Sequence, residues 1–282
     1  MRQLINFSDK NFKSKQKWNS KTAKLIGGFD EVRELSPEDL EYCSFKNPDF
    51  LKNKGYGFYF WKPQIFYKKL QQLQEGDYLA YADSGSFFVK SVNPLITYME
   101  EKQSPFLFYK LPLIERQWTK RDSFMIMDCD TPEFTDTPQI SASFFIMKKC
   151  KESLEFTREW LSYCEDVRII GDGPNTAGKP NYPEYINHRF DQSALSLMVK
   201  KWRINPVSDI TDYGVFPRMY YHEDRFLFDK SVLYEKNAFG GIILHNRKKS
   251  PLSYAAKYYI RRLVGNFGFK IGHDKTMASR FN

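Results

Sequence analysis

The sequence predicts an α/β protein built on a mainly parallel central sheet with helices on both faces. Strand-like and helix-like segments alternate, beginning with a short strand at residues 3–8 and a helix that Gly27-Gly28 ends. Residues 77–83 (DYLAYAD) and 141–149 (SASFFIMKK) are nearly continuous apolar runs, as expected of strands covered on both faces. This alternation is typical of a parallel sheet that lies between two layers of helices.

Length and cysteine content favour one enzyme-sized domain. A chain of 282 residues can bury a large core without disulfides. Cys43, Cys129, Cys150 and Cys164 are scattered, and no pair has the C-x-x-C spacing, so we expect reduced, buried thiols. The first residues lack the apolar stretch of a signal peptide, and no segment reaches the roughly 18–20 apolar residues of a membrane span. We expect a cytoplasmic protein.

The elements of the first hundred residues follow from local signals. Residues 29–35 predict a second strand, and Ser36-Pro37 predicts the cap and first turn of a short helix. Residues 55–64 (GYGFYFWKPQ) predict a loop of glycine and aromatic residues. A helix should begin at Pro63, run to about Gln74 and end at Gly76, directly before the strand 77–83. Residues 86–100 predict a short strand and a helix.

The second half of the chain gives signals of the same kind. Residues 101–140 predict a long, polar and irregular stretch, and the strand 141–149 follows it. The next helix is amphipathic, with Leu154, Trp160, Leu161 and Cys164 along one side. Residues 194–199 (ALSLMV) predict a helix, and residues 240–245 (GGIILH) predict a strand.

Positive charge is concentrated at the end of the chain. The formal charge is +9, and nine basic residues and one acid follow His245, so the tail carries +8 and the body about +1. We therefore expect a catalytic domain at 1–245 and a helical tail at 246–282. Because the tail also holds aromatic and apolar residues, it predicts binding to an anionic membrane surface. Nucleic acid is an alternative partner of the tail. In a third interpretation the tail has no such partner and is a helix that packs on the body with its basic face in solvent.

Asp83-Ser84-Gly85 ends the apolar strand 77–83. Ligands of open α/β sheets bind beyond the carboxyl ends of strands, so the strand would deliver Asp83 to a site on a rigid support. Ser84 and Gly85 leave room for a bulky anion, which the carboxylate would reach through a divalent cation such as Mg²⁺ or Mn²⁺. A turn-forming aspartate is the alternative.

An ordered set of stretches carries a family resemblance over roughly residues 1–250. These stretches are LINFSD, GYGFYFWKPQ, DYLAYADSG, ISASFFIMKKC, NHRFDQSALSL and FGGIILHNRKKS. In this order the chain resembles the GT-A glycosyltransferases, in particular bacterial polysaccharide and lipopolysaccharide transferases with Asp-Ser-Gly in place of Asp-x-Asp. The resemblance implies a Rossmann-like GT-A fold. It also implies transfer of a sugar from a nucleoside diphosphate sugar to a hydroxyl of a cell-surface glycan or glycolipid.

The resemblance also implies a donor site. Asp83 matches the first aspartate of Asp-x-Asp, while Gly85 replaces the second, which is usually the direct metal ligand. His245 matches a histidine that contributes to the metal or the diphosphate. We therefore expect Mn²⁺ or Mg²⁺ at Asp83 and His245, or, without a metal, a diphosphate held by Lys62. The positions matched to the donor nucleotide are Phe7, Ser8, Trp61, Lys62, Asp83, Ser84 and Gly85.

The sugar and acceptor positions come from the later stretches. Asp191-Gln192 is similar to the Asp-Gln pair of retaining, glycogenin-like members, which implies that Asp191 and Gln192 act near the sugar and favours retention. A helix N-cap is the alternative role for Asp191. For an inverting enzyme, Asp136 or Asp130 would deprotonate the acceptor. The positions expected to bind substrate are Glu115, Lys120, Asp130, His188 and Arg189.

Other functions fit the sequence less well. Residues 173–180 (GPNTAGKP) nearly match a phosphate-binding loop, but Pro180 removes the magnesium-binding hydroxyl, which excludes this loop type. No G-x-G-x-x-G follows the first strand, which disfavours a dinucleotide-binding oxidoreductase. The histidines lack the ligand spacing of a zinc hydrolase, which disfavours that class as well. A basic nucleic-acid-binding protein is the alternative from another class. The nearly neutral body disfavours it, and a glycosyltransferase acting on DNA would combine both ideas.

Overall fold

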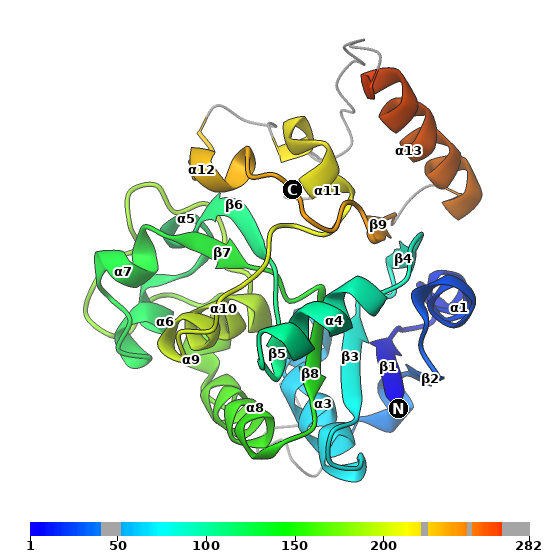
Figure 1. The fold of residues 1–282 in the computed structure, drawn as a ribbon. Helices are drawn as coiled ribbons and strands as arrows, with labels where there is room; N and C mark the ends of the chain where they lie inside the picture. The colour runs from blue at the N-terminus through cyan, green and yellow to red at the C-terminus, as the bar shows by residue number, and fades with distance from the viewer. Residues whose placement is uncertain (41–51, 221–224, 247–249, 267–282) are drawn as a thin grey trace.

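A five-stranded sheet forms the centre of the computed structural model, which describes residues 1–40, 52–220, 225–246 and 250–266 (Figure 1). Its strands lie in the order β2-β1-β3-β8-β5. Strand β1 pairs in parallel with β2 and β3, whereas β8 is antiparallel to both β3 and β5. Four strands thus share one direction, and the predicted mainly parallel sheet is confirmed. The strands are β1 (Arg2–Phe7), β2 (Glu31–Leu35), β3 (Tyr78–Ala82), β5 (Phe106–Leu107) and β8 (Phe144–Lys148).

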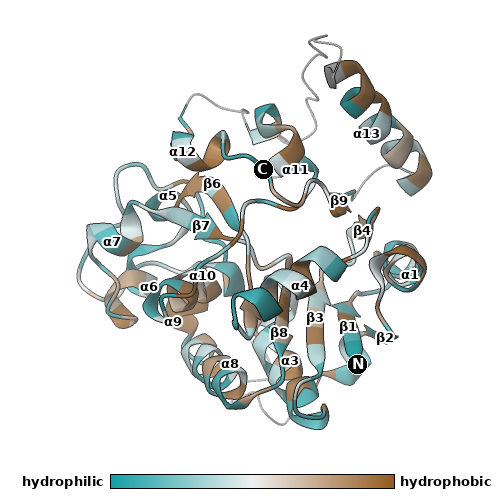
Figure 2. Cartoon of the chain, in the orientation of Figure 1, coloured by the Kyte–Doolittle hydropathy of each residue, from teal (hydrophilic) through white to brown (hydrophobic). Residues whose placement is uncertain are grey.

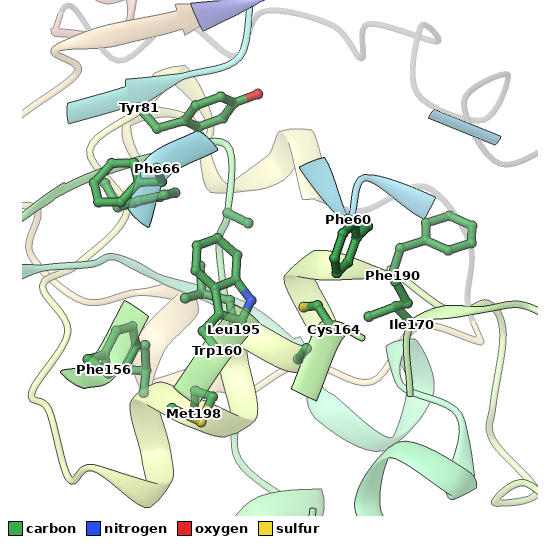
Figure 3. Packing of buried hydrophobic residues seen from close by; sticks show 14 of the residues in the cluster. Phe60, Phe66, Tyr81, Phe156, Trp160, Cys164, Ile170, Phe190, Leu195 and Met198 are labelled. Carbon is green, nitrogen blue, oxygen red and sulfur yellow. The ribbon is translucent and has the colours of Figure 1, made fainter. Parts of the chain in front are cut away.

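Helices cover both faces of this sheet, as predicted. Side chains alternate along β3, so Leu79 and Tyr81 join the core on one face and Tyr78 and Ala80 join the core on the other. The first face is covered by α3 (Trp61–Gln72), α8 (Lys151–Cys164) and α10 (Asp191–Lys201). Figure 3 shows this packing around Trp160, which is fully buried. Helix α4 (Asn93–Glu101) covers the second face.

The first strand leads into a helix that ends where the glycines predict. Helix α1 (Lys13–Thr22) continues as a π-helical turn, Ala23–Gly27, and Gly28 follows with a left-handed φ of 83°. After β2, a 3-10 turn, Pro37–Asp39, begins with the predicted Ser36 cap. The helix expected to begin at Pro63 begins two residues earlier, at Trp61.

Residues 101–140 are not the irregular stretch that the sequence predicts. They form short elements, each of two to six residues, which are too short to give a hydrophobic period. A second, two-stranded sheet pairs the two longer strands among them, β6 and β7. Besides β5, these elements are β6 (Lys110–Ile114), α5 (Glu115–Trp118), α6 (Arg121–Ile126), α7 (Pro132–Thr135) and β7 (Pro138–Ile140).

The C-terminal part of the chain pairs with the first half in a separate two-stranded sheet. Strand β4 (Ser86–Phe88) pairs antiparallel with β9 (Ile243–His245), which confirms the strand predicted there. Helix α13 (Pro251–Asn266) then packs on this pair through Tyr258, which contacts Phe87 and Leu244. The predicted helical tail is therefore present at 251–266, and residues 247–249 and 267–282 lie outside the described ranges. Five short elements complete the described ranges: α2 (Lys54–Phe58), α9 (Val167–Ile170), α11 (Asp212–Val215), a 3-10 turn (Pro217–Tyr220) and α12 (Lys230–Leu233).

Within the described ranges, no helix combines the length and the apolar character needed to cross a membrane.

Candidate functional site

A cavity of about 340 Å³ lies beyond the carboxyl end of β3. This volume lies within the range of about 300–1,000 Å³ that is usual for small-molecule sites. The cavity gathers side chains from segments that are more than 180 residues apart in the sequence, from Lys54 to His245. Among the lining residues are seven that the sequence analysis singles out: Lys62, Asp83, His188, Arg189, Asp191, Gln192 and His245.

Strand β3 delivers Asp83 to the cavity, and the antiparallel strand β8 holds it there. The backbone amide of Asp83 donates to the carbonyl of Ser143, 2.8 Å away, directly before β8 begins. Its side chain is 25% exposed and accepts a hydrogen bond of 2.8 Å from the Tyr81 hydroxyl. Asp83 is thus a rigidly supported carboxylate that faces the cavity.

Lys62 connects Asp83 to the second cavity carboxylate. Its ammonium nitrogen lies 2.6 Å from Oδ2 of Asp191 and 4.0 Å from Oδ1 of Asp83. It also donates to the carbonyl of Ala142 at 3.3 Å and lies 4.7 Å from the centre of the Tyr81 ring. The three charged groups come from α3, β3 and α10, so the core fixes their spacing.

Burial and charge oppose each other in this group. Burial raises the pKa of the Asp191 carboxyl to about 6, although Lys62 pulls it down. Burial also favours a lower pKa for Lys62, but the carboxylates of Asp191 and Asp83 outweigh burial and raise it. Near neutral pH Lys62 and Asp191 therefore form a buried ion pair in the cavity wall.

His245 enters the cavity from β9, within a chain of hydroxyl groups. Its Nε2 lies 3.1 Å from the Ser143 hydroxyl, which lies 2.5 Å from the hydroxyl of Tyr109. On the opposite side, Nδ1 lies 3.5 Å from Oδ1 of Asp212, and the same oxygen accepts from the His245 backbone amide at 3.0 Å. Asp212 also accepts from the Tyr254 hydroxyl at 2.5 Å, which ties α13 to the cavity wall.

Asp83 and His245 meet only part of the requirement for a metal site. Within the described ranges, no group of three or more His, Cys, Asp or Glu side chains could hold a metal ion. Both expected ligands line the cavity and contact Ser143, Asp83 through its backbone amide and His245 through its imidazole. Mg²⁺ usually takes one or two protein carboxylates and completes its shell with water and substrate phosphates. Asp83 and His245 therefore fit a metal ion only if a bound phosphate compound supplies further ligands to it.

An unusual turn forms the wall beside Lys62. From Gly55 to Tyr59 every residue has a left-handed φ, between 54° and 82°, although Tyr56, Phe58 and Tyr59 are not glycines. Such conformations are costly for residues with a Cβ and persist where the surroundings enforce them, often at functional sites. Lys54 and Tyr59 line the cavity, so this turn shapes part of its wall.

The donor-nucleotide positions at the end of β1 lie outside the cavity lining. Phe7 stacks on Trp61, with ring centroids 4.0 Å apart, and Trp61 is buried. Ser8 donates to Gln16 at 2.8 Å, and the Ser84 hydroxyl donates at 2.5 Å to the carbonyl of Phe7. Gly85 is buried as well. These contacts join the ends of β1 and β3. Of the five expected positions that do not line the cavity, only Phe7 is partly exposed.

The charged residues expected at an acceptor site also lie elsewhere. Glu115 is fully buried and its Oε2 lies 2.6 Å from Lys200, Asp136 pairs with Arg116, and Asp130 binds Arg121 at 2.8 Å. The buried Lys120 donates to the carbonyl of Gly173 at 3.0 Å. Glu115, Lys120, Asp130 and Asp136 thus lie outside the lining of this cavity. They pair within the folded segment 110–140 and its neighbours.

His188 lines the cavity, but protein groups use both of its ring nitrogens. Nδ1 accepts from the backbone amide of Lys120 at 3.2 Å, and Nε2 donates to the carbonyl of Ile169 at 2.8 Å. Burial and, to a smaller extent, the nearby Lys120 lower the pKa of this imidazole to about 3. His188 is therefore neutral and structural. Arg189 and Gln192 also line the cavity.

Several residues at the cavity are not among the expected site residues. Tyr109, Ser141 and Ser143 form the hydroxyl cluster at His245, and Asp212 lies behind that histidine. Ser141 and Ser143 precede β8, and only a strand antiparallel to β3 brings its start to the carboxyl end of β3. The polar S-A-S run before an apolar strand is the signal, once the strand direction is known.

This chain is similar to known proteins in structure but not in sequence. No protein-family model matches the sequence, and no curated protein matches it. Mouse xyloside xylosyltransferase 1 (apo form) has a TM-score of 0.47 at 9% identity, and the match covers 89% of this chain and 99% of that chain. The glycosyltransferase GlyE of Streptococcus pneumoniae TIGR4 has a TM-score of 0.45 at 11% identity, over 88% of this chain and 55% of that chain. At these values neither likeness transfers a residue role or an activity.

Proposed function

We propose that this protein is a glycosyltransferase that moves a hexosyl or pentosyl group from a nucleoside diphosphate sugar to a hydroxyl of a cell-surface glycan or glycolipid. We also propose that it acts in the cytoplasm. The observation that carries the proposal is the cavity at the end of β3, where Asp83, Lys62, Asp191 and His245 meet on rigid elements. Ligands of α/β sheets bind at such strand ends.

The lining suits both parts of the donor. Lys54 and Arg189 supply positive charge for a diphosphate, in addition to Lys62, and an arginine can bind phosphate oxygens with two parallel hydrogen bonds. Asn187, Asp191 and Gln192 present amide and carboxylate groups that can bind sugar hydroxyls. Tyr213, Tyr220 and Phe226 add aromatic surface, which packs well against the apolar face of a sugar.

Asp83 and His245 would hold Mn²⁺ or Mg²⁺ together with the diphosphate. Such an ion would offset the charge of the leaving diphosphate. This assignment rests on the place of the Asp83 carboxylate and the His245 imidazole in the cavity lining and on the open shell that two protein donors leave. We expect chelation to weaken the binding of the nucleoside diphosphate.

Asp191 and Gln192 are the proposed catalytic residues, at the sugar. A buried carboxylate beside the anomeric carbon can stabilise the positive charge that develops there during transfer. Gln192 is fixed by a hydrogen bond of 2.8 Å to Gln139, so its amide can orient a sugar hydroxyl. Asp130 and Asp136, the bases expected for inversion, lie outside the cavity, which favours retention.

Thermal stabilisation by a panel of nucleoside diphosphates and their sugars, with and without Mn²⁺, tests the proposal. At a ligand concentration about a hundredfold above Kd, site binding adds about 2.7 kcal/mol of stability. We expect Asp83→Ala to lose this shift and Asp136→Ala, an acid outside the cavity, to keep it. Nuclear magnetic resonance of the product then gives the anomeric configuration. A protein that binds no member of the panel, or equal shifts in both variants, would refute the donor site.

A further inference from the structure

Helix α13 exposes apolar side chains on the side opposite to its packed face. Tyr258 is only 3% exposed and anchors the helix on β4 and β9. Leu252, Tyr259, Ile260 and Leu263 are 67%, 48%, 59% and 62% exposed. Their spacing of three, four and seven residues places them along one side of the helix. In Figure 2 the apolar parts of α13 are brown.

This exposure is concentrated on one element. Ten large apolar side chains are exposed among the described residues, and four of them belong to α13. A helix of 16 residues is about 24 Å long, so the four side chains form a stripe and not a point. Contiguous exposed apolar surface on a folded protein marks an interaction site more often than scattered residues do.

Positive charge accompanies the stripe. Helix α13 contains Lys257, Arg261 and Arg262 and no acidic residue. Lys90, on the loop after β4, adds a further ammonium ion near Arg262, since this arginine, together with burial, lowers the pKa of Lys90. Charges of one sign are thus gathered at α13 without a carboxylate on the helix itself.

We propose that the exposed face of α13 docks on an anionic lipid surface, with Leu252, Ile260 and Leu263 at the level of the lipid headgroups and Lys257 and Arg261 beside their phosphates. A helix with an apolar stripe and basic flanks binds in the plane of such a surface. Duplex nucleic acid matches the charge but offers no apolar phase for leucine and isoleucine. A lipid surface matches both features, and this inference does not depend on the proposed transferase activity.

The docked helix would lie close to the cavity. Tyr254 of α13 donates to Asp212 at 2.5 Å, and Asp212 accepts from the backbone amide of His245 at 3.0 Å. A membrane-bound α13 would therefore hold the cavity wall near the lipid surface, where a lipid-linked acceptor would be found.

Co-sedimentation of the full chain with vesicles tests the proposal. The probes are vesicles of phosphatidylcholine alone and vesicles with about 30% phosphatidylglycerol. We expect binding to the anionic vesicles to be at least about tenfold tighter and to weaken with salt. We expect the triple variant Leu252→Ser/Ile260→Ser/Leu263→Ser to lose most of this binding. The pair Lys257→Gln/Arg261→Gln should lose the preference for anionic lipid.

A matched control uses exposed apolar residues elsewhere. Leu25 and Tyr234 are 73% and 69% exposed, so Leu25→Ser/Tyr234→Ser should bind vesicles like the unchanged protein. Because all seven substitutions lie at exposed or half-buried positions, circular dichroism should show folded variants. Equal binding to both vesicle types, or full binding by the triple variant, would overturn the proposal. Tighter binding to duplex DNA than to vesicles, unchanged in the triple variant, would overturn it in favour of nucleic acid.

Discussion

Lys62 contacts the groups that define the proposed donor site, with its ammonium ion 2.6 Å from Asp191 and 4.0 Å from Asp83. The side chains of Lys62 and Asp191 are each only 6% exposed, so water screens their attraction little. Removing one member of a buried ion pair leaves an uncompensated charge, which costs more than the pair contributes. The stability of this region therefore depends on both partners together.

We predict that Lys62→Met lowers the free energy of unfolding by about 2–4 kcal/mol, because two carboxylates lose their counter-ion. Asp191→Asn in the same background should restore part of the loss, with a coupling of about 1–3 kcal/mol. Urea denaturation of the two single variants and the double variant measures this cycle. Strictly additive losses would contradict the pairing of Lys62 with Asp191.

The neutral state of His188 makes stability depend on pH. The pKa of the folded imidazole is about 3, whereas the unfolded value is 6.5. Between these values the unfolded chain binds a proton that the folded protein does not, so the free energy of unfolding falls as the pH decreases from 6.5 towards 3. This one residue contributes at most roughly 4–5 kcal/mol to the fall.

His188→Gln should flatten this dependence, because an amide can accept from Lys120 and donate to Ile169 without titrating. The measurement is the urea midpoint of both proteins at pH 7.5 and pH 5. The unchanged protein should lose more stability between these values than the variant does. Equal losses of stability in the two proteins would show that a different group causes the fall in stability at acidic pH.

Among the elements, the left-handed turn from Gly55 to Tyr59 combines strain with a place at the cavity. A Cβ built on Gly55 lies 2.5–2.6 Å from the Tyr59 ring, and the φ of Gly55 is 64°. Gly76 has a similar φ of 86°, with nothing within 4 Å of its Cβ position. The two glycines therefore separate the cost of a left-handed φ from the cost of a clash.

We predict that Gly76→Ala costs about 1 kcal/mol, from its φ alone. Gly55→Ala should cost more, about 2–3 kcal/mol, because Tyr59 must also move. Since Tyr59 lines the cavity, only Gly55→Ala should weaken nucleotide binding as well. Thermal denaturation and the ligand-induced shift measure both effects. Equal losses in the two variants would mean that the turn adapts to the added methyl group.

Elements with a clear pattern in their own residues could be predicted from the sequence. Features that depend on pairing with a distant segment of the chain could not. The stretch 77–83 is nearly continuous in apolar residues and ends at Asp83, so β3 and the place of Asp83 at its end follow from the sequence. The direction of β8 depends on its pairing with β3, which no local pattern contains. In a strand parallel to β3, Ser141 and Ser143 would lie at the opposite end of the sheet from Asp83.

The charged stretch 115–136 shows the same limit for side chains. Its acids suggest a polar loop that faces a ligand, but Glu115 is fully buried and binds Lys200, which lies 85 residues further along the chain. A buried carboxylate with a distant partner looks the same in the sequence as an exposed catalytic one. The alternation of strands and helices predicts the architecture, whereas the ion pairs depend on contacts between distant segments.

Across the whole molecule, the cores differ greatly in size. Two extended clusters fill the two faces of the sheet, while α13 is held mainly by a small cluster of Phe87, Leu244 and Tyr258. Regions with few buried apolar contacts open at a lower free energy than the global unfolding reaction. The molecule therefore contains a stable α/β body and a helix attached to it by few contacts.

We predict that amides of α13 exchange with solvent at least about a hundredfold faster than amides of β3, because local opening releases α13 without disrupting the sheet. Hydrogen exchange with mass spectrometry of the full chain measures both segments at once. A nucleoside diphosphate should slow exchange around Asp83 and leave α13 unchanged, whereas anionic vesicles should slow exchange in α13. Equal protection of α13 and β3 in the free protein would show that the helix is part of the same cooperative unit, since the two segments would then open only together.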